Sequence, residues 1–236
     1  MTALRSSQSG GLSMAPTQAI LFDIDGTLVD SVYLHVDAWR RAFADHGLVA
    51  PAWEIHRRIG KDGSLLVEEL MDVAGGDSGS SDLASELSSA HDEHYGSRSD
   101  ELTVLPGARD LVRRCKDSDF VVVLATSAPE HELEILRSLL DVEDAVDAVT
   151  SGADVETAKP DSTVVALALE RAGVTAENAV MIGDATWDFV AATDIGVHGL
   201  GVRSGGIAAQ ELRAAGASEV FADASELLAR SDLFAH

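Results

Sequence analysis

The sequence predicts an α/β fold, a Rossmann-like parallel sheet core with an inserted all-helical domain. Short apolar runs of strand length alternate with helix-like stretches over most of the chain, and this alternation is typical of right-handed β–α–β units. Residues 31–102 interrupt the alternation with helical patterns alone. We therefore expect an α/β core at 17–30 and 103–236, a helical insertion at 31–102 and a disordered tail at 1–16, which is rich in Ser and Gly.

The strands of the core are expected to be short, apolar and buried on both faces, as in parallel sheets. The clearest run begins at Ala19 and ends just before Gly26. We expect strands at 19–24, 120–125 and 179–182, weaker ones at 145–150, 197–202 and 219–221, and helices at 107–117, 129–140, 161–173, 187–195, 206–215 and 224–230.

The insertion shows amphipathic helical patterns at 32–46, 64–73 and 82–95. A loop rich in Gly and Ser separates the last two. His91 and His94 lie three residues apart on the last helix. They could bind a metal together, but an exposed helical face is the favoured interpretation.

The charge balance narrows the class of protein. The chain has 17 Lys and Arg against 40 Asp and Glu, a net charge of −23. This argues against a nucleic-acid partner and against binding to anionic membranes, since both need clustered cations.

The single cysteine, Cys115, excludes an intrachain disulfide, and the apolar runs are too short to span a bilayer. A cytoplasmic location is expected.

The segment Asp23-Ile24-Asp25-Gly26-Thr27 ends the first expected strand. Residues two apart in an extended chain point to the same side, so Asp23 and Asp25 form a pair. Paired carboxylates suit a hard divalent cation, or a nucleophile beside a general acid/base. Gly26 permits close approach of the backbone to a ligand. Ordinary turn residues at a strand end are the alternative for this segment alone.

Three further segments follow expected strands or begin expected helices. Thr126-Ser127 offers hydroxyl and N–H groups to a phosphate oxygen, or else caps a helix. Lys159, one of three lysines, offers a point cation to an anionic substrate, or else is a surface lysine. Asp184 and Asp188, one helical turn apart, offer metal-binding oxygens or else form a capping pair.

Taken together, the four segments carry a stronger signal than each does alone. Ligands of open α/β sheets bind beyond the carboxyl ends of the strands, so these side chains are expected at one edge. Carboxylates, a hydroxyl and a lysine gathered there make a Mg²⁺ site with an anion pocket. Oxygen ligands favour Mg²⁺ over a transition metal.

These segments resemble the four motifs of the haloacid dehalogenase-like hydrolase superfamily in their order and spacing. The resemblance covers the chain from about residue 18 to its end. The helical insertion is similar to the cap of the subgroup that includes phosphoglycolate phosphatases and β-phosphoglucomutases. The matching segments are Asp23-x-Asp25-Gly-Thr-Leu, Thr126, Lys159-Pro160 and Gly183-Asp184-x-x-x-Asp188, with Asp30-Ser31 and His35 at the entry to the cap.

The resemblance implies a role for each residue. Asp23 is the implied nucleophile, which forms an aspartyl-phosphate. Asp25 is the implied general acid and then general base. Thr126 and Lys159 are implied to hold the phosphoryl oxygens. The implied Mg²⁺ ligands are Asp23, the backbone carbonyl of Asp25 and Asp184, with Asp188 supporting the metal site or orienting Lys159.

Substrate choice is expected to lie in the cap. The segment Arg57-Arg58-Ile59-Gly60-Lys61-Asp62-Gly63 places three cations in a chain that has few. It is similar to the cap loop that reaches over the active site in this subgroup, although a solvated helix end is the alternative. The substrate-binding candidates are Gly26, Thr27, Ser127, His35, Arg58 and Lys61.

The expected function is a Mg²⁺-dependent phosphatase that hydrolyses a small phosphate monoester, phosphoglycolate-like or sugar-phosphate-like. Asp25 favours phosphoryl chemistry over dehalogenation, because a halide leaving group needs no proton. A phosphomutase of the β-phosphoglucomutase type is the enzymatic alternative. A receiver-like phosphorylation module is the other alternative, but it needs neither Asp25 nor a large cap.

Overall fold

The computed structural model describes residues 18–154 and 159–230, so the tail expected at 1–16 lies outside the described residues. Its centre is a six-stranded sheet with the order β5-β4-β1-β6-β7-β8, in which neighbouring strands are parallel. This confirms the predicted parallel α/β core. The strands are β1 (Ala19–Phe22), β4 (Val121–Ala125), β5 (Ala148–Thr150), β6 (Ala179–Gly183), β7 (His198–Val202) and β8 (Ala217–Phe221).

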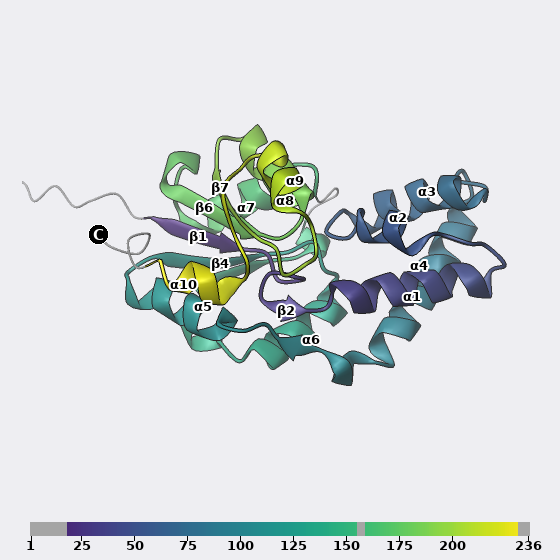
Figure 1. The fold of residues 1–236 in the computed structure, drawn as a ribbon, viewed down its shortest axis with the longest axis horizontal. Coiled ribbons are helices and arrows are strands. Elements are labelled where there is room, and N and C mark those ends of the chain that lie inside the picture. The colour runs from purple at the N-terminus through teal and green to yellow at the C-terminus, as the bar shows by residue number, and fades with distance from the viewer. Residues whose placement is uncertain (1–17, 155–158, 231–236) are drawn as a thin grey trace, which may run out of the picture.

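Helices cover both faces of this sheet (Figure 1). Side chains alternate along β1, so Ile20 and Phe22 pack with α5, α6 and α10, whereas Ala19 and Leu21 pack with α7 and α8. Burial on both faces explains why β1 is an uninterrupted apolar run. The core helices are α5 (Ala108–Asp117), α6 (Glu130–Leu140), α7 (Thr163–Ala172), α8 (Thr186–Asp194), α9 (Ala209–Ala215) and α10 (Ala224–Leu228).

The inserted segment lies beside the core and consists of helices (Figure 1). These are α1 (Val32–Asp45), α2 (Ala52–His56), α3 (Gly63–Ala74) and α4 (Ser81–Gly96). They share a hydrophobic cluster of their own, with Trp39, Phe43, Leu70 and Leu87 among its buried members. We keep residues 31–102 as the proposed extent of this cap.

Two short elements of the structure are absent from the sequence prediction. Strands β2 (Val29–Asp30) and β3 (Thr103–Val104) pair antiparallel where the chain enters and leaves the cap. Each strand has only two residues, too few for the alternation of apolar and polar residues that marks a strand in a sequence. Helix α2 has five residues, fewer than two turns.

The register of the sheet positions the candidate site. Phe22, the last residue of β1, pairs with Leu124 of β4 and with Ile182 of β6. The segments that follow these three strands therefore emerge side by side at one edge. Among the described helices, none is long and apolar enough to cross a membrane.

Candidate active site

Asp23 lies at the centre of the site, directly after β1. Its backbone N–H donates to the carbonyl of Ile182 (2.9 Å), which extends the ladder to β6 by one residue. Its side chain is buried, and its Oδ1 accepts a hydrogen bond from Lys159 Nζ at 2.5 Å. Residues 23 and 159 are 136 positions apart, so the fold alone brings this predicted pair together.

Lys159 is fully buried between two carboxylates. Its Nζ lies 2.5 Å from Asp23 Oδ1 and 2.7 Å from Asp188 Oδ1. Burial favours the neutral amine, but the charges and hydrogen bonds of Asp188 and Asp23 outweigh it and raise the pKa of Lys159. Lys159 is therefore a fixed cation inside the site, and the surface-lysine alternative is wrong.

Asp188 is engaged on both oxygens. Its Oδ1 faces Lys159, and its Oδ2 accepts the backbone N–H of Ala185 (3.0 Å). Gly183 is required beside it, because a Cβ at that position would lie 2.3 Å from Asp188 Oδ2. These contacts favour orientation of Lys159 over direct metal binding, and the direct metal contact stays a prediction.

Asp184 follows β6 and points toward the loop after β1. Its Oδ1 accepts a hydrogen bond from the Thr27 hydroxyl (3.2 Å). Two glycines allow the backbone to approach it: a Cβ on Gly26 would lie 2.4 Å from Asp184 Oδ2, and one on Gly205 only 1.6 Å away. Thr27 and Gly26 are predicted substrate-binding residues. In the structure the Thr27 hydroxyl donates to the Asp184 carboxylate, and the backbone of Gly26 lies next to it.

The carboxylates of Asp23, Asp184 and Asp188 form a buried group whose ligand oxygens lie within 4.8 Å of one another. Burial raises the pKa of Asp23 to about 8, with Asp188 and Asp25 adding to the shift, although Lys159 acts against it. Burial and the charges of Asp23 and Asp188 likewise raise the pKa of Asp184. The single positive charge of Lys159 thus cannot balance the negative charges of three buried carboxylates. The oxygen donors and the excess negative charge fit Mg²⁺.

Asp25 faces the entry to the cap. Its Oδ1 accepts a hydrogen bond from Ser31 (2.5 Å) and lies 3.5 Å from His35 Nε2 on α1. Burial opposes its charge, but the hydrogen bonds and charges of His35 and Ser31 outweigh burial and lower the pKa of Asp25. His35 is therefore a neighbour of the predicted general acid/base.

Thr126 and Ser127 lie at the end of β4, as expected. Thr126 is buried, and its Oγ1 accepts the backbone N–H of Ala128 (3.0 Å), which leaves its own hydroxyl proton to donate. The Ser127 hydroxyl is also buried and has no hydrogen-bond partner within 18–154 and 159–230. Because β4 pairs with β1, these hydroxyls follow the strand next to Asp23.

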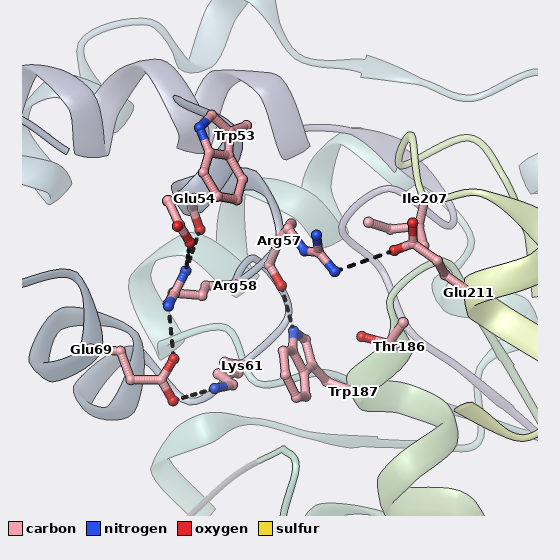
Figure 2. Close-up of a pocket in the computed structure, with 10 residues that line it drawn as sticks. All are labelled: Trp53, Glu54, Arg57, Arg58, Lys61, Glu69, Thr186, Trp187, Ile207 and Glu211. Carbon is pink, nitrogen blue, oxygen red and sulfur yellow. Dashed lines mark hydrogen bonds and ion pairs between the residues drawn. The ribbon is translucent and has the colours of Figure 1, made fainter. Parts of the chain in front are cut away.

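Arg58 and Lys61 lie in a separate pocket of about 360 Å³ between the cap loop and helices α8 and α9 (Figure 2). Arg58 pairs with Glu54 (2.5 Å) and Glu69 (2.8 Å), and Lys61 pairs with Glu69. Lys61 Nζ also lies 4.2 Å from the ring centroid of Trp187. Both cations are thus already partnered, and their contact with a substrate stays a prediction.

The cap loop contacts the core beside the site. The N–H of Asp62 donates to the carbonyl of Lys159 (2.7 Å), and Trp187 Nε1 donates to the carbonyl of Arg57 (3.1 Å). His56 Nε2 donates to the carbonyl of Gly205 at 2.8 Å. These contacts were not predicted, since they join residues far apart in the sequence.

Two buried residues near Asp25 were also missed, and one expectation about them is wrong. His91 was expected on an exposed face, but it is 4% exposed, because α6 and α1 cover it. Its position in the buried series Leu87, His91 and Tyr95 on α4 was the available signal. Glu132 of α6 is 3% exposed, and burial raises its pKa to about 7. No sequence pattern marks it.

Comparison with curated proteins finds relatives that are phosphatases. The chain is 32% identical over 187 residues to a phosphorylated carbohydrates phosphatase from Thermotoga maritima, covering 77% of this chain and 82% of that protein. It is 30% identical over 218 residues to a phosphoglycolate phosphatase from Rhodospirillum rubrum, covering 89% of each.

Among solved structures, a hydrolase from Pseudomonas syringae superposes with a TM-score of 0.86 at 31% identity, over 93% of this chain and 100% of that one. A putative β-phosphoglucomutase from Bacteroides vulgatus shares the fold, with a TM-score of 0.83 at 20% identity over 93% of this chain and 89% of that one. A family model for haloacid dehalogenase-like hydrolases matches residues 17–196. The chain therefore belongs to the haloacid dehalogenase-like hydrolases and is an enzyme of their phosphatase type.

Proposed function

We propose that the protein is a Mg²⁺-dependent phosphatase that hydrolyses a small phosphate monoester through an aspartyl-phosphate on Asp23. The observation that carries the proposal is the buried arrangement of Asp23, Lys159 and Asp184 at one sheet edge. The named relatives act on phosphorylated carbohydrates or phosphoglycolate, so we propose a substrate of that size and charge. We keep the cytoplasm as the proposed location.

In the proposed reaction, Asp23 acts as the nucleophile. Its Oδ1 is held by Lys159, and a carboxylate oxygen can attack phosphorus to form an acyl phosphate while the ester oxygen leaves. Lys159 also supplies positive charge for the phosphoryl oxygens in the transition state. Thr126 and Ser127 provide hydroxyl donors beyond the neighbouring strand.

The proposed metal ligands are Asp23, Asp184 and the backbone carbonyl of Asp25. The two carboxylates carry part of the excess negative charge of the site. Bound Mg²⁺ supplies charge neutralisation that lets a carboxylate approach an anionic phosphate. Thr27 orients Asp184 through its hydroxyl. Asp188 holds Lys159 between itself and Asp23.

In the proposed reaction, Asp25 transfers protons. Burial opposes a charge on His35, but Asp25 and Glu132 outweigh it and raise the pKa of His35, so the resting proton sits on His35. A phosphate dianion beside Asp25 adds negative charge, which raises the pKa of Asp25 and favours transfer of that proton to it. Asp25 then protonates the leaving oxygen and later accepts a proton from the attacking water.

The test is turnover of p-nitrophenyl phosphate with Mg²⁺, followed by a phosphate-release screen over phosphorylated metabolites. We expect multiple turnovers that fall by on the order of 10⁴-fold or more in Asp23→Asn, as for loss of a nucleophile. Asp30→Asn, on the exposed strand end beside the motif, is the control that keeps activity. Full activity in Asp23→Asn overturns the proposed nucleophile.

The phosphomutase alternative is separated by its product. With β-glucose 1-phosphate, a phosphatase releases inorganic phosphate, whereas a mutase yields the 6-phosphate isomer. The phosphatases among the relatives favour the first outcome. The receiver-like alternative is disfavoured, because the matching family consists of hydrolases. It predicts stoichiometric labelling of Asp23 without turnover.

A further inference from the structure

A second cluster of potential ligands lies at the joint between cap and core. His35 on α1, His91 on α4 and Glu132 on α6 each contribute a ligand atom, and these atoms lie within 4.8 Å of one another. The three residues are 7%, 4% and 3% exposed, respectively. Two elements of the cap and one of the core thus meet around a single buried point.

The imidazole rings of His35 and His91 face each other through one nitrogen each, which we call the inner nitrogens. His35 Nδ1 lies 3.1 Å from His91 Nε2. Their outer nitrogens face carboxylates: His35 Nε2 lies 3.5 Å from Asp25 Oδ1, and His91 Nδ1 lies 3.1 Å from Asp92 Oδ1. A carboxylate holds a proton on the nitrogen it faces and leaves the opposite nitrogen as a lone pair. The contact between the two inner nitrogens is a hydrogen bond when one of them carries a proton, and a bound cation would displace that proton.

Glu132 supplies an independent observation. Its Oε1 is buried and has no hydrogen-bond partner among the residues that the structure describes. It lies 3.9 Å from His91 Nδ1. A buried carboxylate oxygen without a partner costs free energy that a bound cation would recover. The cluster therefore has an unused acceptor beside two imidazoles.

The surroundings fit a built site with access from solvent. Tyr95 stacks on His35 and Trp39 stacks on His91, each with ring centroids 4.1 Å apart, which fixes both ring planes. On the outer side, exposed His131 lies 3.7 Å from exposed Asp92 and belongs with it to a second ligand group that includes Glu132.

We propose that His35, His91 and Glu132 form a second divalent-metal site, which takes Zn²⁺ or a similar transition ion and joins the cap to the core. Two imidazoles and one carboxylate are a donor set typical of Zn²⁺ and unlike the all-oxygen site of Asp23 and Asp184.

Occupancy of this site has a consequence for the enzyme. An ion held by α1, α4 and α6 restrains the cap, and it fixes His35 beside Asp25. We therefore expect Zn²⁺ to slow turnover even when Mg²⁺ is in excess, because cap movement is needed for exchange of substrate and product. The binding itself does not depend on the proposed phosphatase reaction.

The test titrates Zn²⁺ into the full chain in excess Mg²⁺ and follows binding by calorimetry, with X-ray absorption to identify the ligands. We expect one tightly bound equivalent with two imidazole nitrogens, retained in Asp184→Asn. His91→Ala and Glu132→Gln each weaken Zn²⁺ binding by at least about tenfold. His94→Ala is the matched control on the same helix, since His94 is turned outward to Asp45.

Two results overturn the proposal. Zn²⁺ affinity that is unchanged in both His91→Ala and Glu132→Gln excludes the cluster as the site. Zn²⁺ binding that is lost in Asp184→Asn but kept in His91→Ala assigns the ion to the carboxylate centre instead. Glu132→Gln preserves the shape of the side chain, so it keeps the test decisive if His91→Ala fails to fold, which circular dichroism reports.

Discussion

The active site and the cap-loop pocket both contain a buried lysine, but their charges balance differently. Lys159, with a side chain that is 0% exposed, lies among Asp23, Asp184 and Asp188. Lys61, with a side chain that is 8% exposed, lies in a pocket where Arg57, Arg58 and Lys61 face Glu54, Glu69 and Glu211. The first region has an excess of carboxylates, and the second has equal numbers of each sign.

This difference distinguishes the proposed reaction site from a pocket whose charges are already paired. In the pocket each cation already has a carboxylate partner, so little drives the binding of a further ion. In the candidate active site burial, together with the neighbouring carboxylates, raises the pKa values of Asp23 and Asp184, and the surplus of carboxylates favours a divalent cation. Perturbed carboxyl groups at a strand end therefore point to the candidate active site more clearly than the cap-loop pocket does.

The largest expected effect is that of Lys159→Met, with Lys61→Met as its matched control. Removing the ammonium between Asp23 and Asp188 leaves buried carboxylates uncompensated, which costs about 3–5 kcal/mol of unfolding free energy. It also lowers kcat by about 10²–10³-fold. Lys61→Met is expected to cost at most about 1 kcal/mol, because its partner Glu69 is partly exposed.

Urea unfolding and steady-state kinetics on both variants measure this contrast. Addition of Mg²⁺ is expected to restore part of the stability of Lys159→Met, because a divalent cation replaces the missing positive charge. Equal losses in the two variants would contradict the distinction between the regions.

The next effect is on the pH dependence of the unfolding free energy, which has opposite signs for Asp23 in the candidate active site and Glu69 in the cap-loop pocket. The pKa of Asp23 is raised to about 8, so in chelator its contribution to stability is complete near pH 4 and is lost as pH rises toward 8. The slope reaches about 1.4 kcal/mol per pH unit for one group. Glu69 is desolvated, but Lys61 and Arg58 outweigh this and lower its pKa, so its contribution is present at neutral pH and is lost on acidification.

Unfolding free energies at pH 5, 6.5 and 8 test this, with chelator and with Mg²⁺. Asp23→Asn is expected to reduce the fall between pH 5 and 8, and Mg²⁺ is expected to suppress it, since the ion binds the deprotonated carboxylates. Glu69→Gln serves as the control that leaves this fall intact. A flat profile in chelator for the unmodified protein would count against the raised pKa of Asp23.

The smallest effect is expected for Arg58→Ala. If Arg58 contacts the substrate or holds the loop that does, KM rises about two- to fivefold while kcat changes little, which corresponds to a partly exposed ion pair. Initial-rate kinetics with the best substrate of the metabolite screen measure the split. An unchanged KM in both Arg58→Ala and Lys61→Ala would remove these residues from substrate recognition.

The sequence was most informative where function coincides with the ends of buried strands. Apolar runs locate β1, β4 and β6, and the polar residues after them converge because parallel strands share an edge. Asp23, Thr126 and Asp184 could be predicted for that reason, although the distances and pKa shifts in the site depend on burial that no local pattern encodes. Lys159 follows none of these strands, and only the combination of the four segments indicated it.

Other features depend on packing between distant segments and could not be predicted in this way. His91 shares a face of α4 with the buried residues Leu87 and Tyr95, but its contacts with side chains of α1 and α6 depend on segments far away in the sequence. The pairing of Arg58 and Lys61 with Glu69 joins a loop to a helix at separations of 11 and 8 residues. Because α3 begins only at Gly63, no single helix spans these pairs and a helical period could not predict them.

The hydrogen bond from the Asp62 N–H to the Lys159 carbonyl bears on how such enzymes can be re-engineered. The cap loop, which we propose to take part in substrate choice, contacts the backbone of Lys159, the cation of the proposed reaction centre. A chimera that exchanges the whole insertion for that of a relative would therefore disturb rate as well as preference. Grafts that retain positions 56–62 of this chain and vary only the outer helices are the sounder starting point.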